Sequence, residues 1–399
     1  MNTISKRPGI PKIALFFSLN FKGHRDCLAG ILDYVRLHKP WHLHLMEGRV
    51  GGQRLIQIRK WGCTGIIGSP LQPEAARLIQ KAQVPSVLLM PPPALRAPSN
   101  PLSRYTYLTY DSLRIGQMAA DYFLAKNYQH FAYVNEPLGL YWSKERKQGY
   151  VERLRQAGFA CKVYDTRSPA ERQDWAIEQP HLTAWLRELP KPIALFASMD
   201  ERGRQVIDAC MEAGIAVPDQ VAVLGVDNDE ILCEATFPPL SSIEMDIRQK
   251  GYLIAEHLDR LLHGRKPRKQ VITVQPLRVV LRRSTDTAAS INNPVFQAQR
   301  FIRETACLSP IRVPEVARII GGSRRFAEKR FKAIVGKTIL EEIQHIRMEK
   351  VCQLLTETRI PLHEIARRCQ FKHANYLARR FKLQFGLTLS RFREKASPS

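Results

Sequence analysis

The first 283 residues alternate short apolar runs with longer amphipathic segments. Apolar runs such as 131–134 and 221–226 have the length of buried strands, and segments such as 144–157 repeat apolar residues at helical spacing. Strands and helices in strict rotation favour parallel sheets that helices cover on both faces. The rotation runs through two blocks, so we expect two similar lobes. The further predicted strands are 13–17, 42–45, 65–68, 85–89 and 193–196, and the further helices are 27–37, 53–61, 112–126 and 202–213.

The pattern changes after residue 283. Residues 284–294 are polar and lack periodicity, which is typical of a linker, and the remainder is purely helical in pattern. We therefore predict an α/β domain followed by an all-α domain. The predicted boundaries are 1–283 for the α/β domain, with lobes of about 11–110 and 112–240 and a closing segment 241–283, then 284–294 for the linker and 295–399 for the all-α domain.

The predicted all-α domain carries the same sequence pattern twice. Arg-Phe-Lys at 330–332 is followed after three residues by Gly336, and Arg-Phe-Lys at 380–382 is followed after three residues by Gly386. A short amphipathic segment and a break precede each copy, so each unit is predicted to form helix, tight turn and helix. The second helix has a basic outer face, as in a DNA-reading element, and we expect DNA to be bound at two places.

Each repeated unit has its own predicted core. Gly321 and Gly322 permit the sharp turn of the first unit, and Ser323 is a good N-cap for the helix that follows. A connector helix over 340–355 has a mostly apolar stripe and would hold the two units at a fixed separation. The expected packing is Val316, Ala317 and Ile320 on Ala327 and Phe331 in the first unit, and Ile365, Ala366 and Phe371 on Leu377 and Phe381 in the second.

The exposed faces of the two predicted recognition helices suit the edges of DNA bases. Arginine bonds guanine and asparagine bonds adenine through paired hydrogen bonds, glutamate accepts from cytosine, and alanine or phenylalanine touches a thymine methyl group. Lys332, Lys382, Arg391 and Arg393 suit phosphates instead. A solvated basic helix face is the alternative interpretation, but it does not explain two copies in register. The candidate DNA-binding residues are Ser323, Arg324, Arg325, Phe326, Glu328, Lys329, Lys332, His373, Ala374, Asn375, Arg379, Lys382 and Arg393.

The charge distribution supports a nucleic-acid partner. The net charge is +24, and residues 290–399 contain 22 Lys and Arg against 9 Asp and Glu, whereas the other 289 residues contain 39 against 28. The net positive charge per residue is thus about three times higher in the tail, as expected for a domain that binds a polyanion. We therefore predict double-stranded DNA as a partner of the tail.

Composition argues against several other classes of protein. No apolar run approaches the ~20 residues that span a bilayer, and no secretory signal is evident, so we predict a cytoplasmic protein. The eight cysteines form no Cys-x-x-Cys pair and no zinc-ligand spacing, so neither disulfides nor a bound metal are expected. No Gly-x-Ser-x-Gly, P-loop or His-x-x-x-His motif stands out as that of an enzyme, and no cofactor is implied.

The tail resembles the AraC-type DNA-binding domain over about residues 295–395. The resemblance rests on Ile365-Ala366, on the spacing from Phe371 to Phe381-Lys382, and on Gly386, Phe392 and Arg393. By position it implies a base-contacting surface formed by Arg325, Glu328 and Lys329 in the first unit and by Ala374, Asn375 and Arg379 in the second.

Three positions of the tail depart from the AraC-type pattern. Gln370 stands where the family usually has glycine, and Leu389 replaces the usual proline. Ala327, preceded by Phe326, stands where a core leucine is usual. The two units are therefore not expected to be equivalent.

The α/β domain resembles a LacI-type sensor, which has the two-lobed periplasmic-binding-protein fold, over about residues 11–283. Ala-Ser-Met-Asp at 197–200 precedes a predicted helix, Gly-Ile-Ala-Val-Pro at 214–218 follows it, and a strand closed by Asp227 comes next. A sensor of this type joined to an AraC-type tail resembles bacterial regulators of sugar catabolism. The combination implies a small sugar effector, a pentose of the xylose type.

Ligands of open α/β sheets bind at the carboxyl ends of the strands, and this rule selects candidate residues without any resemblance. Carboxylates and arginines bond adjacent sugar hydroxyls, and an indole face stacks on the C–H surface of a sugar ring. Structural alternatives remain, because Asp200 could cap a helix, Arg25 could pair with Asp26, and Trp142 could be core. The candidate effector-binding residues are Asn20, Arg25, Glu47, Ser69, Trp142, Arg146, Asp200, Asp227 and Asn228.

Together these features predict a sugar-responsive transcription regulator, acting as an activator. Effector binding would close the two lobes, change how two sensors pair in a homodimer, and so place the two tails on operator half-sites. RNA polymerase is a further candidate partner. Two alternatives remain: a DNA-binding regulator with a different effector or none, and a sugar-binding module without a regulatory role.

Overall fold

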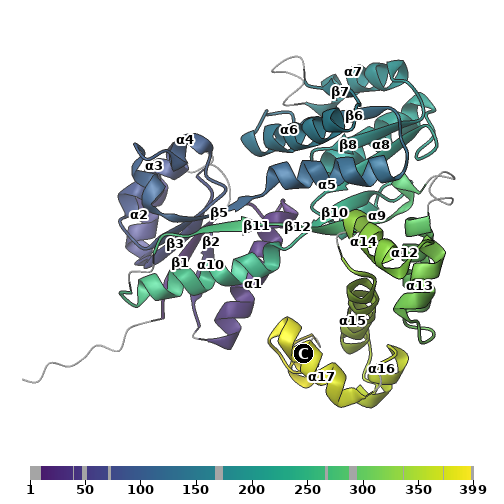
Figure 1. Ribbon diagram of the computed structural model, residues 1–399. Coiled ribbons are helices and arrows are strands. Elements are labelled where there is room, and N and C mark those ends of the chain that lie inside the picture. Colours follow the sequence, from purple (N-terminus) through teal and green to yellow (C-terminus); the bar gives the residue numbers. More distant parts are fainter. Residues whose placement is uncertain are drawn as a thin grey trace, which may run out of the picture. The chain divides into compact units, whose positions relative to one another are not determined.

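The computed structural model describes residues 10–38, 40–46, 52–70, 73–166, 174–265, 268–286, 294–335, 337–371 and 373–396 (Figure 1). The chain divides into two compact units. Residues 1–120 and 129–284 form the α/β unit, and residues 121–128 and 285–399 form the helical unit. Most of the predicted linker, and Gly336 of the repeated pattern, lie outside the described residues.

The first lobe of the α/β unit is a parallel six-stranded sheet with the order β11-β5-β4-β3-β1-β2. Helices α2 and α3 lie on one face of this sheet, and α1 and α10 lie on the other (Figure 1). The strands are β1 (Lys12–Phe16), β2 (His42–Leu45), β3 (Gly65–Gly68), β4 (Ser86–Leu89), β5 (Thr106–Tyr110) and β11 (Val271–Val274). The helices are α1 (Lys22–Leu37), α2 (Gly52–Trp61), α3 (Pro73–Ala82), α4 (Pro93–Arg96), α10 (Ile247–Leu262) and a 3-10 turn, η1 (Pro101–Arg104).

The second lobe is a six-stranded sheet with the order β12-β10-β9-β8-β6-β7. All its pairings are parallel except that of β12 with β10, which is antiparallel. The strands are β6 (Phe131–Val134), β7 (Cys161–Tyr164), β8 (Ile193–Ala197), β9 (Val221–Val226), β10 (Ser241–Met245) and β12 (Pro276–Val280). The helices are α5 (Ser112–Ala125), α6 (Tyr141–Gln156), α7 (Trp175–Glu188), α8 (Asp200–Ala213), α9 (Glu230–Glu234) and a 3-10 turn, η2 (Arg283–Thr285).

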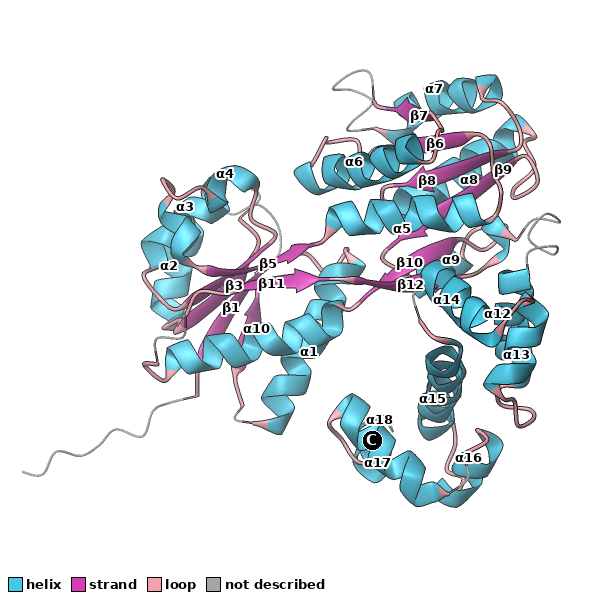
Figure 2. Ribbon diagram, in the orientation of Figure 1, coloured by secondary structure: helices cyan, strands magenta, loops and turns pink. Residues whose placement is uncertain are grey.

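The two-lobed α/β architecture predicted from the sequence is confirmed, but the chain crosses between the lobes more often than the sequence indicated. The segment after β10 forms α10 and β11 on the first lobe and then returns as β12 to the second (Figure 2). The chain therefore passes between the lobes after β5, after β10 and after β11. Strands as short as β11 carry no local signal of the sheet they join, so only their pairing decides it.

Glycines allow the close approach of α5 and α6 in the second lobe. A Cβ atom on Gly116 would lie 2.1 Å from the carbonyl oxygen of Arg146, and one on Gly149 would lie 2.1 Å from that of Leu113. Both contacts are backbone contacts, so no side-chain movement could relieve them. This approach fixes the position of the first turns of α6, which carry Trp142 and Arg146.

The helical unit consists of two small cores joined by one long helix. Each core contains a helix-turn-helix pair (Figure 2). The apolar residues predicted for each core are buried. The connector α15 contributes Ile339 and Ile343 to the first core and Val351 and Leu355 to the second. The helices are α12 (Pro294–Thr305), α13 (Val313–Ile320), α14 (Arg324–Val335), α15 (Ile339–Glu357), α16 (Leu362–Arg368), α17 (Ala374–Phe385) and α18 (Leu389–Ala396).

The turn of each helix-turn-helix pair uses left-handed backbone. Gly321 and Gly322 have φ of +80° and +77°, which agrees with the sharp turn predicted at these two glycines. In the second turn Gln370 has φ of +58°, a conformation that glycine adopts more readily than any other residue. In the described parts of the chain, none of the helices combines the length and apolar composition needed to cross a membrane.

Candidate functional site

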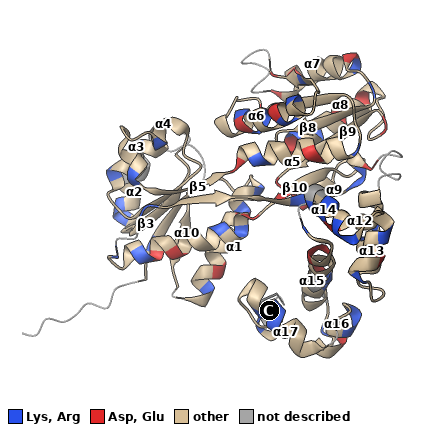
Figure 3. Cartoon of the chain, viewed as in Figure 1, with Lys and Arg blue, Asp and Glu red and all other residues tan. Residues whose placement is uncertain are grey.

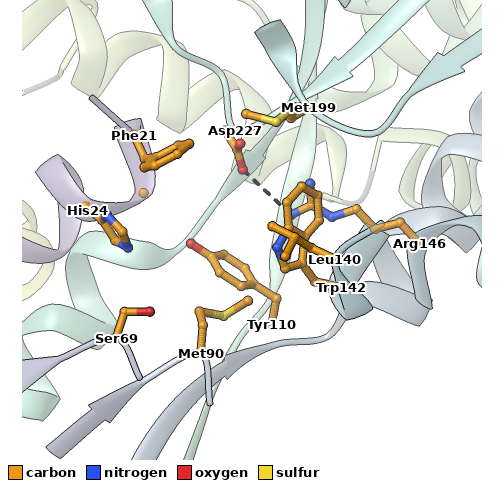
Figure 4. A pocket seen from close by; sticks show the side chains of 11 residues that line it. Phe21, His24, Ser69, Met90, Tyr110, Leu140, Trp142, Arg146, Met199 and Asp227 are labelled. Atoms are coloured by element: carbon orange, nitrogen blue, oxygen red, sulfur yellow. Dashed lines mark ion pairs between the residues drawn. The ribbon is translucent and has the colours of Figure 1, made fainter. Parts of the chain in front are cut away.

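A cavity of about 110 Å³ lies between the two lobes of the α/β unit, at the carboxyl ends of the strands (Figure 4). The first lobe contributes residues that follow or end β1, β3, β4 and β5, and the second contributes residues that follow β6, β8 and β9. This is where ligands bind in open α/β sheets. The lining residues are Phe21, Gly23, His24, Ser69, Met90, Tyr110, Leu140, Trp142, Arg146, Met199 and Asp227.

Arg146 and Asp227 form the charged end of the cavity and point toward one another (Figure 4). Arg146 Nη2 lies 3.8 Å from Asp227 Oδ1, and the Arg146 side chain is only 3% exposed. Arg146 Nη1 donates to the carbonyl oxygen of Ser198, and the guanidinium lies 4.7 Å from the centre of the Trp142 ring. Burial raises the pKa of Asp227 to about 6, and the Arg146 guanidinium opposes this shift. Near pH 7 the pair is therefore charged, with Asp227 able to accept hydrogen bonds.

Two of the residues that line the cavity each have a buried polar atom without a hydrogen-bond partner among the described residues. These atoms are Nε of Arg146 and the hydroxyl oxygen of Ser69. Buried polar atoms are almost always paired, so such atoms indicate a group that the protein does not itself supply. An N–H donor, a hydroxyl and the Asp227 carboxylate together match a ligand rich in hydroxyl groups.

The rest of the cavity wall is mostly apolar or aromatic. Tyr110 ends β5, and burial holds the pKa of its phenol well above 10, so it is a neutral donor. His24 Nδ1 lies 2.9 Å from the carbonyl oxygen of Ser18, and burial lowers the pKa of the imidazole. A neutral, partly aromatic wall suits the C–H faces of a small ring.

The predicted effector-binding residues divide between the cavity wall and other positions. Ser69, Trp142, Arg146 and Asp227 line the cavity. The structure places Asn20, Arg25, Asp200 and Asn228 outside the lining, and Glu47 lies outside the described residues.

Arg25 pairs with a different carboxylate from the neighbour considered in the sequence. Its guanidinium forms an ion pair with Asp229 and donates to the carbonyl oxygens of Leu19 and Asn20, at 2.8 and 3.1 Å. Asp26 is paired with Lys22 instead, at 2.6 Å. Arg25 belongs to the first lobe and Asp229 to the second, so this ion pair joins the lobes beside the cavity.

Asp200 lies outside the cavity lining and is hydrogen-bonded to the loop that carries Asp227. Its carboxylate accepts hydrogen bonds from the hydroxyl of Ser242 and from the backbone N–H of Asp229, at 2.5 and 2.7 Å. Burial, and then the nearby Asp227, raise the pKa of Asp200 to about 8. Asp200 therefore supports the loop that carries Asp227.

The strand-end rule could have found lining residues that the sequence reasoning missed. Tyr110 ends β5 and Met90 follows β4, but β5 was not predicted because its polar and apolar residues alternate without an apolar run. Phe21 and Met199 are neighbours of the predicted Asn20 and Asp200. Nothing in the sequence marks Leu140.

The second candidate site is the outer surface of the recognition helix α14. Arg324, Arg325 and Lys329 are exposed, and Arg324 Nε is 3.0 Å from Glu328 Oε1. Of the remaining candidates in this unit, Ser323, Phe326 and Lys332 are exposed and Glu328 is half-buried. Lysines and arginines gather on this helix (Figure 3).

The outer surface of α17 is arranged in the same way. Asn375, Arg379 and Lys382 are exposed, as is His373 directly before the helix, and Ala374 is half-buried. Arg393 is different, since its Nη2 donates to the carbonyl oxygen of Ile360 at 2.6 Å. Arg393 thus holds α18 against the loop before α16.

Each of the two units contains a stretch that matches a known protein family. Residues 120–285 match the periplasmic binding protein-like domain family, and residues 316–395 match a helix-turn-helix domain family. The chain is 29% identical over 385 residues to the xylose operon regulatory protein of Haemophilus influenzae, covering 96% of this chain and 98% of that protein. It is 29% identical over 386 residues to the xylose operon regulatory protein of Escherichia coli K12, covering 96% and 97%.

A solved structure matches over the same length. The structure of the xylose-binding transcription activator xylR has a TM-score of 0.60 and 27% identity to this chain, covering 98% of this chain and 100% of that one. This chain is a transcription regulator with an AraC-type helix-turn-helix domain and a periplasmic-binding-protein-like sensor.

Within the sensor, hydrogen bonds connect the loop after β9 with residues 282–284 at the end of the α/β unit. Asn228, next to Asp227, accepts a hydrogen bond from Arg282 Nη1 at 3.0 Å, and Arg282 also binds Glu234 at 2.6 Å. Two residues later, the Ser284 hydroxyl donates to the carbonyl oxygen of Val223 on β9 at 2.6 Å. The loop that carries Asp227 is therefore held against the last residues of the sensor.

Proposed function

We propose that the regulator senses a small sugar, a pentose of the xylose type, in the cavity between its lobes. The observation that carries the proposal is that two residues lining the cavity, Arg146 and Ser69, each have a buried polar atom without a partner among the described residues, Nε and the hydroxyl oxygen. A sugar hydroxyl would accept from Arg146, another would bond Ser69, and a third would donate to Asp227. Trp142 would cover one C–H face of the ring.

Effector binding would favour the closed arrangement of the lobes, because both lobes line the cavity and Arg25 and Asp229 already join them beside it. We assign residues 1–283 to the sensor, 284–294 to the linker and 295–399 to the DNA-binding domain. Closure would be passed from the Asp227–Asn228 loop through Arg282 to the linker. Two chains would pair as a homodimer and place their tails on operator half-sites in the cytoplasm.

The names of the full-length relatives, xylose operon regulatory proteins and a xylose-binding transcription activator, support activation of pentose-related genes. RNA polymerase is a further partner in this proposal. The comparisons identify the chain as a regulator, and the identity of its effector is the part of the function that we propose. A different effector, or none, is the remaining alternative. Catalysis is not part of the proposal, because the relatives are regulators.

Sugar affinity is expected to change when operator DNA is bound. If the sugar changes the affinity of the protein for DNA by some factor, DNA must change its affinity for the sugar by the same factor. Calorimetric titration of full-length protein with D-xylose, alone and in complex with operator DNA, measures both affinities. We expect a difference of about 5- to 150-fold, which is usual for such coupling. A shuffled duplex of the same length is the control. Binding of xylose with equal affinity in both states would contradict the coupling, and no binding of any pentose would contradict the effector.

Replacing Arg379 with alanine is expected to weaken binding to operator DNA by about 1–3 kcal/mol and to relax specificity at one base pair. Arg379 is exposed on α17, on the face that would enter the major groove. Arg391→Ala is the matched control. Arg391 is an exposed arginine that we expect to contact phosphate, so its loss should weaken binding to all sequences alike. Binding to a set of single-base operator variants separates the two. A uniform loss for Arg379→Ala would make it a phosphate contact.

A further inference from the structure

Both recognition helices carry an exposed aromatic ring at the same position. Phe326 is the third residue of α14 and Tyr376 the third residue of α17, and each directly precedes a fully buried core residue, Ala327 or Leu377. Phe326 is 54% exposed and Tyr376 is 49% exposed. Single exposed apolar residues need no explanation, but a matched pair in two copies of one unit is not scattered. An aromatic residue at this helix position is therefore a feature of both units and not of the first alone.

The ring of Phe326 is held in place by the turn before it. The backbone N–H of Phe326 donates to the hydroxyl of Ser323 at 3.2 Å, which caps the helix. A Cβ atom on Gly322 would lie 2.8 Å from the Phe326 ring, so the ring packs directly against the glycine. Gly322 has φ of +77°, and both its conformation and this contact disfavour a side chain there. The ring thus has one packed side and one exposed side.

The ring of Tyr376 is held by different neighbours. Its centre lies 6.4 Å from that of Phe371, in the turn before α17. Arg380 Nη1 lies 3.2 Å from the Tyr376 hydroxyl, and the guanidinium lies 5.9 Å from the ring centre. Tyr376 is thus also fixed on one side and open on the other.

Each ring stands one helical turn before a cation expected to contact bases. Phe326 precedes Lys329 by three residues, and Tyr376 precedes Arg379 by three residues, so each pair lies side by side on the helix surface. The first turn of a recognition helix is the part that reaches base edges. In the major groove the 5-methyl group of thymine is the apolar group that base edges present.

We propose that Phe326 and Tyr376 each contact the 5-methyl group of a thymine, one in each half of the operator half-site. The inference rests on the proposed entry of α14 and α17 into the major groove. It adds a specificity determinant to the hydrogen-bonding residues, because a thymine contact next to the base read by Lys329 or Arg379 fixes the register of each helix. The apolar ring supplies what a charged side chain cannot, namely a favourable contact that does not depend on salt.

The test removes the methyl group from the DNA. Operator duplexes are first selected from random-sequence DNA with the full-length protein, and each thymine in the footprint is then replaced by deoxyuridine. We expect one thymine in each half at which loss of the methyl weakens binding about fourfold, the factor that corresponds to exposing one buried methyl group. Wild-type protein that is insensitive to every replacement overturns the proposal.

Variants then assign each methyl to a ring. Phe326→Ala should bind the thymine operator about as weakly as wild type binds the operator with deoxyuridine at the thymine that Phe326 contacts. Replacing that thymine should not weaken the variant further, whereas replacing the thymine contacted by Tyr376 should. Tyr376→Ala should show the same pattern with the two thymines exchanged. Leu383→Ala is the control, because Leu383 is 79% exposed on α17 but far from its first turn. It should leave both sensitivities unchanged.

Two further outcomes are distinguishable. If Phe326→Ala weakens the thymine and deoxyuridine operators equally, the ring only covers the turn at Gly322 and the proposal fails. If Phe326→Ala does not fold, Phe326→Leu keeps an apolar side chain and should retain part of the sensitivity to the methyl group. A protein that selects no operator at all contradicts the proposed function, whereas a selected operator without methyl sensitivity contradicts this inference alone.

Discussion

Asp227→Asn is expected to abolish the response to sugar while leaving operator binding without sugar intact. The substitution removes the acceptor charge at the cavity wall and leaves Arg146, which is only 3% exposed, without its carboxylate partner. Hydrogen bonds to charged groups contribute about 1.5–3 kcal/mol, so sugar affinity should fall roughly 10- to 100-fold. Calorimetry with D-xylose and operator binding with and without xylose measure the two effects. Asp219→Asn, an exposed carboxylate of the same lobe, should change neither.

The pH dependence provides a second readout for the same residue. Because burial raises the pKa of Asp227 to about 6, the carboxylate is mostly ionised at pH 7 and becomes protonated as the pH falls through about 6. Wild-type affinity for sugar should therefore fall below about pH 6, and the Asp227→Asn variant should lack this fall. If the Asp227→Asn variant keeps its response to sugar, Asp227 is not part of the effector site.

Phe331→Ala and Phe381→Ala are each expected to unfold one DNA-reading unit and leave the other. Phe331 and Phe381 are fully buried at equivalent positions of the repeat, in two separate cores. Truncating a buried phenylalanine costs about 3–5 kcal/mol, which is a large fraction of the stability of a core this small. Each variant should lose the footprint of one half of the operator half-site. Denaturant unfolding followed by circular dichroism measures the stability loss.

Leu340→Ala is the control for this pair, since Leu340 is 50% exposed on the connector α15 and its removal should change stability little. If either phenylalanine variant loses both halves of the footprint together, the two cores unfold as one cooperative unit. That result would make α15 a structural coupler of the two units rather than a spacer.

The DNA-binding tail is the part of the protein that its sequence predicted best. Helical periodicity, two glycines and a repeated pattern are local signals, and the predicted packing of Val316, Ala317 and Ile320 on Ala327 and Phe331 is confirmed. The turn at Gln370 shows why the departures mattered: the chain keeps the left-handed backbone there although the side chain is no longer glycine. The base-contacting residues themselves remain predictions, because an exposed side chain does not reveal what it binds.

The cavity was only partly predictable. Asp227 and Arg146 follow strands or begin helices that the apolar pattern marked, so the strand-end rule selected them. Tyr110 and Met90 belong to strand ends of the other lobe, and which strand ends face one another depends on the sheet order. Asn228 and Arg25 show the converse. Asn228 follows β9 and is bound by Arg282, whereas Arg25 lies in the first turn of α1 and is paired with Asp229.

The sequence by itself determined the two α/β lobes, the two helix-turn-helix units and the positive charge of the tail, because periodicity and charge are properties of neighbouring residues. The tertiary structure alone decided that the chain crosses between the lobes three times, that Arg146 meets Asp227, and that Asn228 is linked to Arg282 near the end of the α/β unit. Such pairings join residues far apart in the sequence, and they follow from which strands lie adjacent in a sheet. A local pattern contains no information on that adjacency, which arises only when the whole sheet is assembled.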